Sequence, residues 1–121
     1  DLSVICGPPE FAEDKKVAVT NPILIVEVLS KSTAVRDRVD KFEMYGYLES
    51  LRQYVLVEQE RKLVEMYTRN SYDGEWRYSR YTQDDETANF TAVGLSIAID
   101  KIYDGVDFPE GGAGRLLNLR N

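Results

Sequence analysis

One carboxylate, that of Glu27, lies inside an otherwise apolar segment of the chain. Residues 22–29 (Pro-Ile-Leu-Ile-Val-Glu-Val-Leu) are rich in β-branched side chains, which predicts a strand buried on both faces of a sheet. An ionised carboxylate in such a place is destabilising unless a cation, hydrogen-bond donors or a metal ion compensates for its lost hydration. Glu27 is therefore either a functional group or one half of a buried structural ion pair with Lys41 or Arg38.

A row of polar side chains is predicted to point inward from the next element. Residues 34–51 have an amphipathic pattern that indicates one helix. Asp37, Lys41 and Tyr45 are spaced i, i+4 and i+8, so they stack in one row, and Arg38 projects beside it. An exposed i, i+4 ion pair contributes only about 0.3–0.5 kcal/mol. The inward direction of the row is what favours a function.

These residue types suit phosphodiester hydrolysis assisted by a divalent metal ion. Mg²⁺ and Mn²⁺ prefer oxygen ligands, and Asp1 and Glu27 stand on consecutive apolar strands where they can converge on one ion. Lys41 is the candidate to hold the attacking water and offset charge at phosphorus. Asp37 and Tyr45 would orient this lysine.

Composition limits the other classes of function. The 121 residues include no histidine, which excludes a Ser-His-Asp or Cys-His nucleophile system within this stretch. The single cysteine, Cys6, fits a reducing compartment and is expected to be a buried small hydrophobe. No apolar run is long enough to cross a membrane, so we expect a cytoplasmic protein. The net charge of −6 argues against nucleic-acid binding by electrostatics alone.

The chain is expected to form one domain over residues 1–121, with a flexible glycine-rich tail at 110–121. It begins with Asp inside an apparent strand, which suggests the C-terminal part of a longer protein. Strands are predicted at 2–6, 53–58, 63–68, 76–81 and 90–99, and a short helical turn at 101–106. The strands at 2–6 and 22–29 are expected to be neighbours that run near-parallel.

The motifs resemble those of a known family. The resemblance is carried by Asp1, 25–30 (Ile-Val-Glu-Val-Leu-Ser), 32–33 (Ser-Thr), 37–42 (Asp-Arg-Val-Asp-Lys-Phe) and Tyr45. Together they are similar to the Uma-type family of bacterial endonucleases, within the restriction-endonuclease-like PD-(D/E)XK superfamily. The similarity continues through residues 50–57 and 64–67 and so spans most of the chain.

The resemblance implies an α/β restriction-endonuclease-like core, a mixed β-sheet flanked by helices, here with a C-terminal β-meander. It implies Asp1, Glu27 and the Val28 carbonyl as ligands of Mg²⁺ or Mn²⁺. The superfamily lysine should stand two residues after the glutamate, where this chain has Leu29, and the resemblance assigns that role to Lys41. Arg38 would contact a phosphate or secure the helix.

Two functions follow as hypotheses. The first is a magnesium-dependent endonuclease that acts on DNA, with a homodimer presenting two sites. The second is a non-catalytic nuclease-fold module for binding or assembly, which the apolar Leu29 and the negative net charge favour.

Overall fold

Strands make up most of the described structure. The computed structural model describes residues 2–10, 21–29 and 42–108. The elements within these ranges are β1 (Leu2–Ile5), β2 (Pro22–Leu29), β3 (Gln53–Glu58), β4 (Val64–Arg69), β5 (Trp76–Tyr81), β6 (Thr87–Phe90), β7 (Leu95–Ala98) and α2 (Ile99–Ile102). Among these residues, no helix has the length and apolar character needed to cross a membrane.

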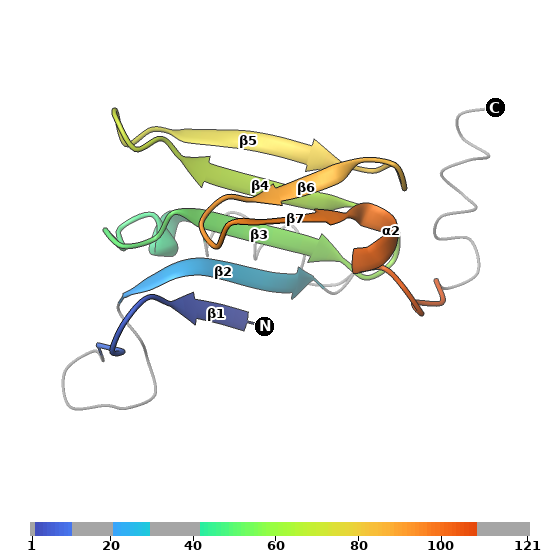
Figure 1. The fold of residues 1–121 in the computed structure, drawn as a ribbon, viewed down its shortest axis with the longest axis horizontal. Coiled ribbons are helices and arrows are strands. Elements are labelled where there is room, and N and C mark those ends of the chain that lie inside the picture. The colour runs from blue at the N-terminus through green and yellow to red at the C-terminus, as the bar shows by residue number, and fades with distance from the viewer. Residues whose placement is uncertain (1, 11–20, 30–41, 109–121) are drawn as a thin grey trace.

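The first five strands form a mixed sheet in the order β1-β2-β3-β4-β5 (Figure 1). Strands β2 and β3 run parallel, whereas the other neighbouring pairs are antiparallel. The mixed sheet is the one predicted, and it is consistent with a restriction-endonuclease-like fold. The flanking helices and the C-terminal β-meander stay predictions.

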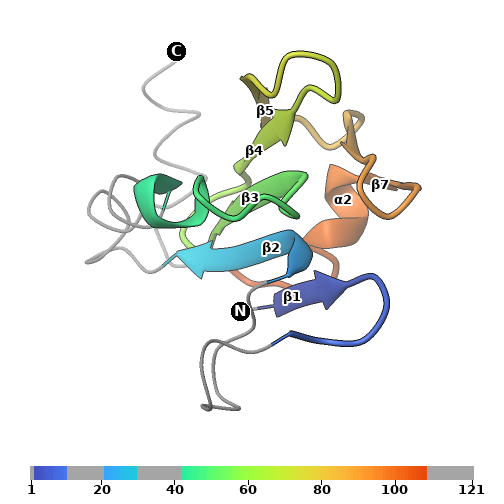
Figure 2. The same cartoon turned by 90° about the vertical axis from the view of Figure 1, so that its left-hand side faces the viewer.

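The interior strand β2 packs on both of its faces, as its apolar sequence predicts. On one face, which we call the aromatic face, Tyr54, Tyr67 and Trp76 pack with Ile25 and Leu29. On the other, the hairpin face, the cluster contains Leu24, Val55, Val64, Met66, Ala88, Phe90, Ile99 and Tyr103. Figure 2 shows α2 and β7 on one side of the sheet and residues 42–51 on the opposite side. Two apolar layers therefore enclose the sheet.

The predicted direction of the first strand is wrong. β1 is the neighbour of β2, as expected, but the two strands are antiparallel, with Leu2 opposite Val26. The connection between them returns the chain to the same end of the sheet, whereas a parallel pair needs a crossover. The Asn21 side chain joins the two ends of this connection, because it accepts a hydrogen bond from the Glu10 N–H at 2.8 Å and donates one to the Pro8 carbonyl at 3.0 Å.

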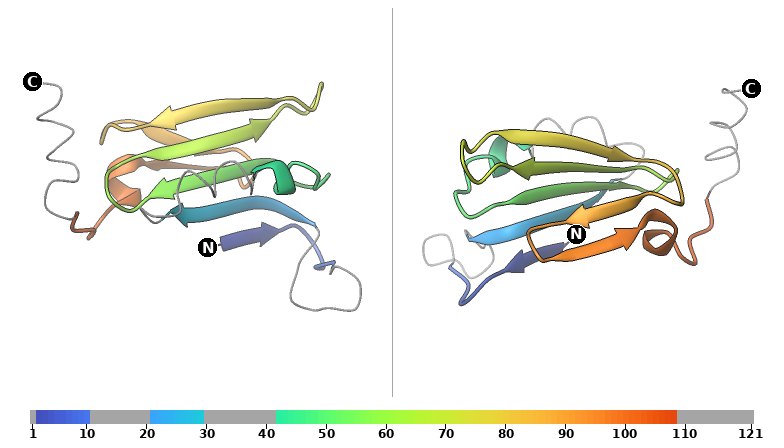
Figure 3. Two further views of the ribbon diagram at one scale, coloured as in Figure 1. Left: turned by 180° about the vertical axis from the view of Figure 1, so that it is seen from behind. Right: turned by 45° about the horizontal axis from the view of Figure 1, so that its top comes forward.

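The prediction of one continuous strand over residues 90–99 is also wrong. The segment contains the end of β6, a turn at 91–94, β7 and the start of α2. Gly94 has a φ of 68° in this turn, a conformation that glycine adopts without steric cost. β6 and β7 form a separate two-stranded sheet, which lies in front of the hairpin face in the right-hand view of Figure 3. The predicted helical turn at 101–106 begins two residues earlier, as α2.

The helix predicted over 34–51 ends earlier than expected. Residues 42–45 are helical, and the Gly46 N–H makes the closing hydrogen bond to the Phe42 carbonyl at 2.9 Å. Turns follow, which bring Leu51 into the aromatic face. The predicted start of this helix lies outside the described residues. Cys6 is exposed, so its predicted burial is wrong, because the chain leaves the sheet directly after β1.

Candidate functional site

Glu27 is buried on the aromatic face, where the hydroxyl of Tyr45 reaches it. Its side chain is only 5% exposed, and it lies on the same face of β2 as Ile25 and Leu29. The Tyr45 hydroxyl donates a hydrogen bond to Glu27 Oε1 over 3.1 Å. The inward direction predicted for Tyr45 is therefore correct. The structure gives its hydroxyl a bond to the carboxylate, where the sequence predicts a role in orienting Lys41.

Aromatic packing fixes the position of Tyr45. Its ring meets the buried Tyr54 edge-on, with 5.3 Å between ring centroids. One turn earlier in the helix, Phe42 stacks on Tyr67 at 4.2 Å and meets Trp76 edge-on at 5.5 Å. Such ring pairs are directional as well as apolar. They hold the last helical turn against the sheet, so the hydroxyl has a defined place beside Glu27.

Arg69, at the end of β4, holds the turns that follow the helix. Its guanidinium donates to the carbonyls of Gly46, Leu48 and Glu49 over 3.0, 3.2 and 3.1 Å. It also lies over Trp76, 4.5 Å from the ring centroid. Burial lowers the pKa of Arg69, as does nearby Arg52, while Glu49 raises it. A cation at these carbonyls satisfies groups that the end of a helix leaves without partners.

The predicted site residues fall into two sets. Glu27, Val28 and Tyr45 are described, and the structure brings Glu27 and Tyr45 into contact. Asp1, Asp37, Arg38 and Lys41 lie outside the described residues, so the convergence of Asp1 and Lys41 on Glu27 stays a prediction. Leu2, the first described residue, pairs with Val26 next to Glu27.

β2 offers the type of donor atom, oxygen, that a Mg²⁺ or Mn²⁺ site requires. Glu27 supplies a carboxylate, and the Val28 side chain is 44% exposed, at a point where the strand nears its end. Leu29 is 1% exposed within the aromatic face, so a lysine there would bury its charge in the core. In the described ranges, no three acidic or cysteine side chains gather in a way that could hold a metal ion.

Strand register places a further set of polar residues on the face of Glu27. Glu27 is opposite Leu56, Leu56 is opposite Glu65, and Glu65 is opposite Arg80. The Tyr78 hydroxyl donates to Glu65 Oε1 over 2.7 Å. Burial, together with this hydrogen bond, raises the pKa of Tyr78 to about 12. Sequence reasoning missed this row, because alternation indicates which residues share a face only after the register is known.

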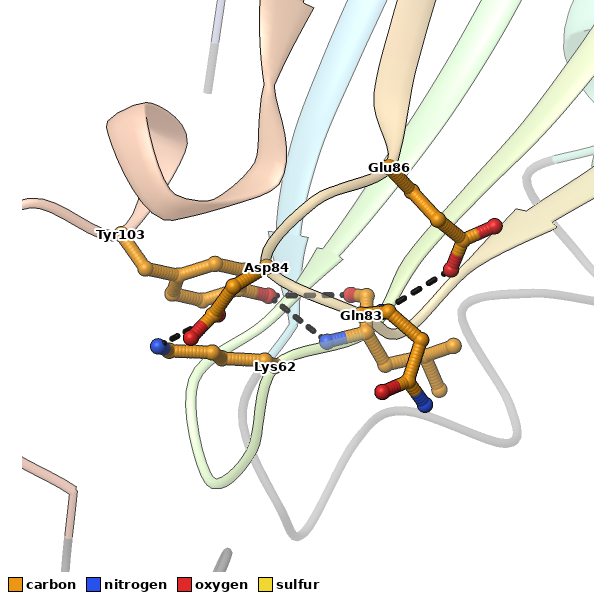
Figure 4. A network of polar contacts seen from close by, with 6 residues as sticks. Lys62, Gln83, Asp84, Glu86 and Tyr103 are labelled. Atoms are coloured by element: carbon orange, nitrogen blue, oxygen red, sulfur yellow. Dashed lines mark hydrogen bonds and ion pairs between the residues drawn. The ribbon is translucent and has the colours of Figure 1, made fainter.

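The loops beside the far end of β3 are held by local polar contacts (Figure 4). The buried Tyr103 hydroxyl accepts from the Leu63 N–H at 3.1 Å and lies 2.8 Å from the Glu58 carbonyl, to which it donates. Burial raises the pKa of Tyr103. Lys62 pairs with Asp84 at 2.7 Å, which links the β3–β4 turn to the loop after β5.

Glu86 closes the loop after β5. Its carboxylate accepts hydrogen bonds from the backbone N–H groups of Thr82 and Gln83, each at 2.9 Å. These two donors lower the pKa of Glu86, because they favour its charged form.

The motif residues and the sheet agree with a comparison against protein families. Residues 1–100 match the model of the Uma2 family, which is described as "Putative restriction endonuclease". The chain belongs to the Uma2 family. The family assignment supports a nuclease-type function.

Two relatives in Synechocystis sp. carry no assigned activity. The chain is 38% identical over 110 residues to the uncharacterized protein slr1290, a match that covers 89% of this chain and 55% of that protein. It is 41% identical over 76 residues to the uncharacterized protein sll1609, covering 63% of this chain and 42% of that protein. The chain thus spans about half the length of these curated relatives.

Proposed function

We propose that the protein is a cytoplasmic, metal-dependent endonuclease that hydrolyses phosphodiester bonds in DNA, with Mg²⁺ or Mn²⁺ as cofactor. The observation that carries the proposal is a buried carboxylate, Glu27, on an interior strand of a mixed sheet in a chain of the Uma2 family. The finer features of the fold, helices that flank the sheet and a C-terminal β-meander, belong to the same proposal.

In this proposal, Asp1, Glu27 and the Val28 carbonyl hold the metal ion. When bound, the ion supplies Lewis-acid activation of the phosphodiester and of the attacking water. Tyr45 holds Oε1 of Glu27 through its hydrogen bond, which fixes the orientation of the carboxylate. Lys41 positions the water and offsets negative charge at phosphorus, Asp37 orients Lys41, and Arg38 contacts a phosphate.

The test is cleavage of supercoiled plasmid by the full-length protein with Mg²⁺ or Mn²⁺. We expect cleavage that requires the metal and is lost in Glu27→Gln and in Lys41→Ala. Glu75→Gln is the matched control, since Glu75 is an exposed glutamate in the turn before β5. Cleavage that survives Glu27→Gln in a folded variant would contradict the assignment of the site.

Tyr45→Phe tests the hydrogen bond to Glu27. A hydrogen bond to a charged group contributes about 1.5 kcal/mol, which corresponds to about tenfold in affinity. We expect metal binding, measured by calorimetry, to weaken by up to about that factor. Tyr47→Phe should leave it unchanged, because Tyr47 is 88% exposed on the same segment. Equal affinities in the two variants would exclude a positioning role for Tyr45.

The alternative is a non-catalytic nuclease-fold module, and the buried Leu29 at the usual lysine position is the observation that favours it. A folded protein that neither binds metal nor cleaves nucleic acid would establish this alternative.

A further inference from the structure

Strand β5 differs from the rest of this acidic molecule in charge. Its six residues, Trp-Arg-Tyr-Ser-Arg-Tyr, include two arginines and no acid, whereas the whole chain has a net charge of −6. β5 is also the last strand of the five-stranded sheet, so in the described structure one of its edges carries no neighbouring strand. Arg77 and Arg80 are both exposed along it.

These arginines are not neutralised by contacts within the described part of the chain. No hydrogen bond or ion pair shorter than 4 Å joins Arg77 or Arg80 to a carboxylate there. Two of the three acidic side chains in the loop that follows β5 are engaged elsewhere, because Asp84 pairs with Lys62 and Glu86 accepts from two backbone N–H groups (Figure 4). The positive charge of β5 is therefore available to an anionic partner.

Tyr78 adds a fixed aromatic surface on the same face as Arg80, whereas Arg77 projects from the opposite face of β5. Its side chain is 49% exposed, yet its hydroxyl is tied to Glu65 over 2.7 Å and its ring lies 5.3 Å from that of Tyr67. A half-exposed ring that is already held in place loses little conformational entropy when a ligand packs on it. Nucleic-acid bases stack on such rings irrespective of sequence.

The geometry connects this strand to the candidate site. Tyr78 and Arg80 share the aromatic face with Glu27, and Arg80 lies in the same cross-strand row. Strands in a sheet are about 4.8 Å apart, so the three steps from β2 to β5 span about 14 Å.

We propose that β5 is a nucleic-acid-binding edge, where Arg80 binds a phosphate of the strand to be cut and Tyr78, on the same face of the sheet, packs against one of its bases. The proposal rests on the proposed nuclease function, because it names the contact by which that substrate is held. It also explains how a chain of negative net charge binds a polyanion, since the contact needs only a local basic strip.

The experiment measures binding of the full-length protein to fluorescent DNA by anisotropy in EDTA, where no metal-dependent cleavage occurs. We expect Arg80→Gln to weaken binding of single-stranded and duplex DNA about three- to tenfold and to reduce the slope of log affinity against log salt by about one. Arg52→Gln is the control. It removes the same charge from an exposed arginine that directly precedes β3, two strands away from β5.

A second pair of variants tests the ring. Tyr78→Ala should weaken binding of single-stranded DNA more than that of duplex DNA, because paired bases do not offer their faces for stacking. Tyr78→Phe, which keeps the ring but loses the hydroxyl that holds it, should retain more of this binding than Tyr78→Ala does. Tyr72→Ala is the control, because it removes the ring of a tyrosine that lies outside β5, in the turn before it, and is 98% exposed.

The outcomes separate this proposal from the nuclease assignment. Equal losses in Arg80→Gln and Arg52→Gln, or no binding by the wild type at low salt, would overturn the binding edge even if plasmid is cleaved. Binding that depends on Arg80 in a protein that cleaves nothing would keep the edge and reject the nuclease.

Discussion

Two tyrosines on the aromatic face each donate a hydrogen bond to a buried glutamate: Tyr45 to Glu27 over 3.1 Å and Tyr78 to Glu65 over 2.7 Å. Both glutamates are buried, so the hydroxyls replace part of the hydration that the carboxylates lose. At the residue scale, the sheet thus accommodates polar groups on a face that is otherwise aromatic.

The raised pKa of Tyr78 predicts a pH dependence of stability. The pKa in the folded state is about 12, whereas an unperturbed tyrosine titrates near pH 10. The folded state therefore holds this proton more tightly, so the contribution of Tyr78 is complete below about pH 10 and falls as pH rises toward 12. Urea unfolding of the wild type and Tyr78→Phe at pH 8 to 11.5 measures it.

The difference in unfolding free energy between these two proteins should be constant up to about pH 9.5 and then shrink. A difference that stays constant to pH 11.5 would contradict the hydrogen bond to Glu65. Tyr72→Phe is the control, because Tyr72 is almost fully exposed.

Part of the site can be predicted from residues alone. Glu27 stands out because a charge in an apolar run demands compensation, and helical spacing gives the direction of Tyr45. Arg80 and Glu65 could not be found in this way. Their place beside Glu27 depends on the pairing of four strands, and pairing is set by contacts between residues distant in sequence.

At the scale of elements, one buried amide joins the main sheet to the β6–β7 hairpin. The Gln53 side-chain NH₂ donates to the Asn89 carbonyl at 3.0 Å, and its side-chain oxygen accepts from the Ala92 N–H at 2.9 Å. Gln53 is fully buried on β3. The hairpin therefore docks through polar contacts as well as through the apolar contacts of the hairpin face.

Gln53→Met should lower the free energy of unfolding by about 2–4 kcal/mol, because it leaves two backbone groups of the hairpin without partners. Urea unfolding followed by circular dichroism measures the loss. Gln83→Met is the matched control at an exposed glutamine and should change stability by less than about 0.5 kcal/mol. A loss of similar size in both variants would show that Gln53 does not hold the hairpin.

The strands were predicted better than the connections. Apolar runs located β2, β3 and β4 because burial leaves a clear pattern in the sequence. The hairpin at 87–98 was missed, because its apolar alternation continues into α2 and hides the turn that Gly94 permits. The end of the helix at residue 45 was missed as well, because the carbonyls that follow it bind Arg69, a residue far along the chain.

At the scale of the whole molecule, both faces of the sheet are packed, while its two ends differ. β1 is a short strand of four residues next to the strand of Glu27. At the other edge, β5 ends the sheet and carries Arg77 and Arg80. A substrate strand bound at β5 would contact a single subunit over a short length. A homodimer, which we propose, would present two such sites to the two strands of duplex DNA.

The homodimer predicts how plasmid cleavage depends on protein concentration. At concentrations where sedimentation shows a dimer, linear plasmid should form with little open-circle intermediate, because both strands are cut in one encounter. Dilution to monomer should yield the open circle first. Linear product formed in one step by a protein that stays monomeric would contradict the dimer.

The hydrogen bonds from Arg69 to the turn after the helix have a consequence for sequence variation among related proteins. Arg69 holds residues 46–49 through backbone oxygens, and every amino acid has such an oxygen. The exposed side chains at 47 and 49 are therefore free to diverge while the path of the turn, and with it the place of Tyr45 over Glu27, is kept. Arg69 and Trp76, which stack on one another, would have to change together.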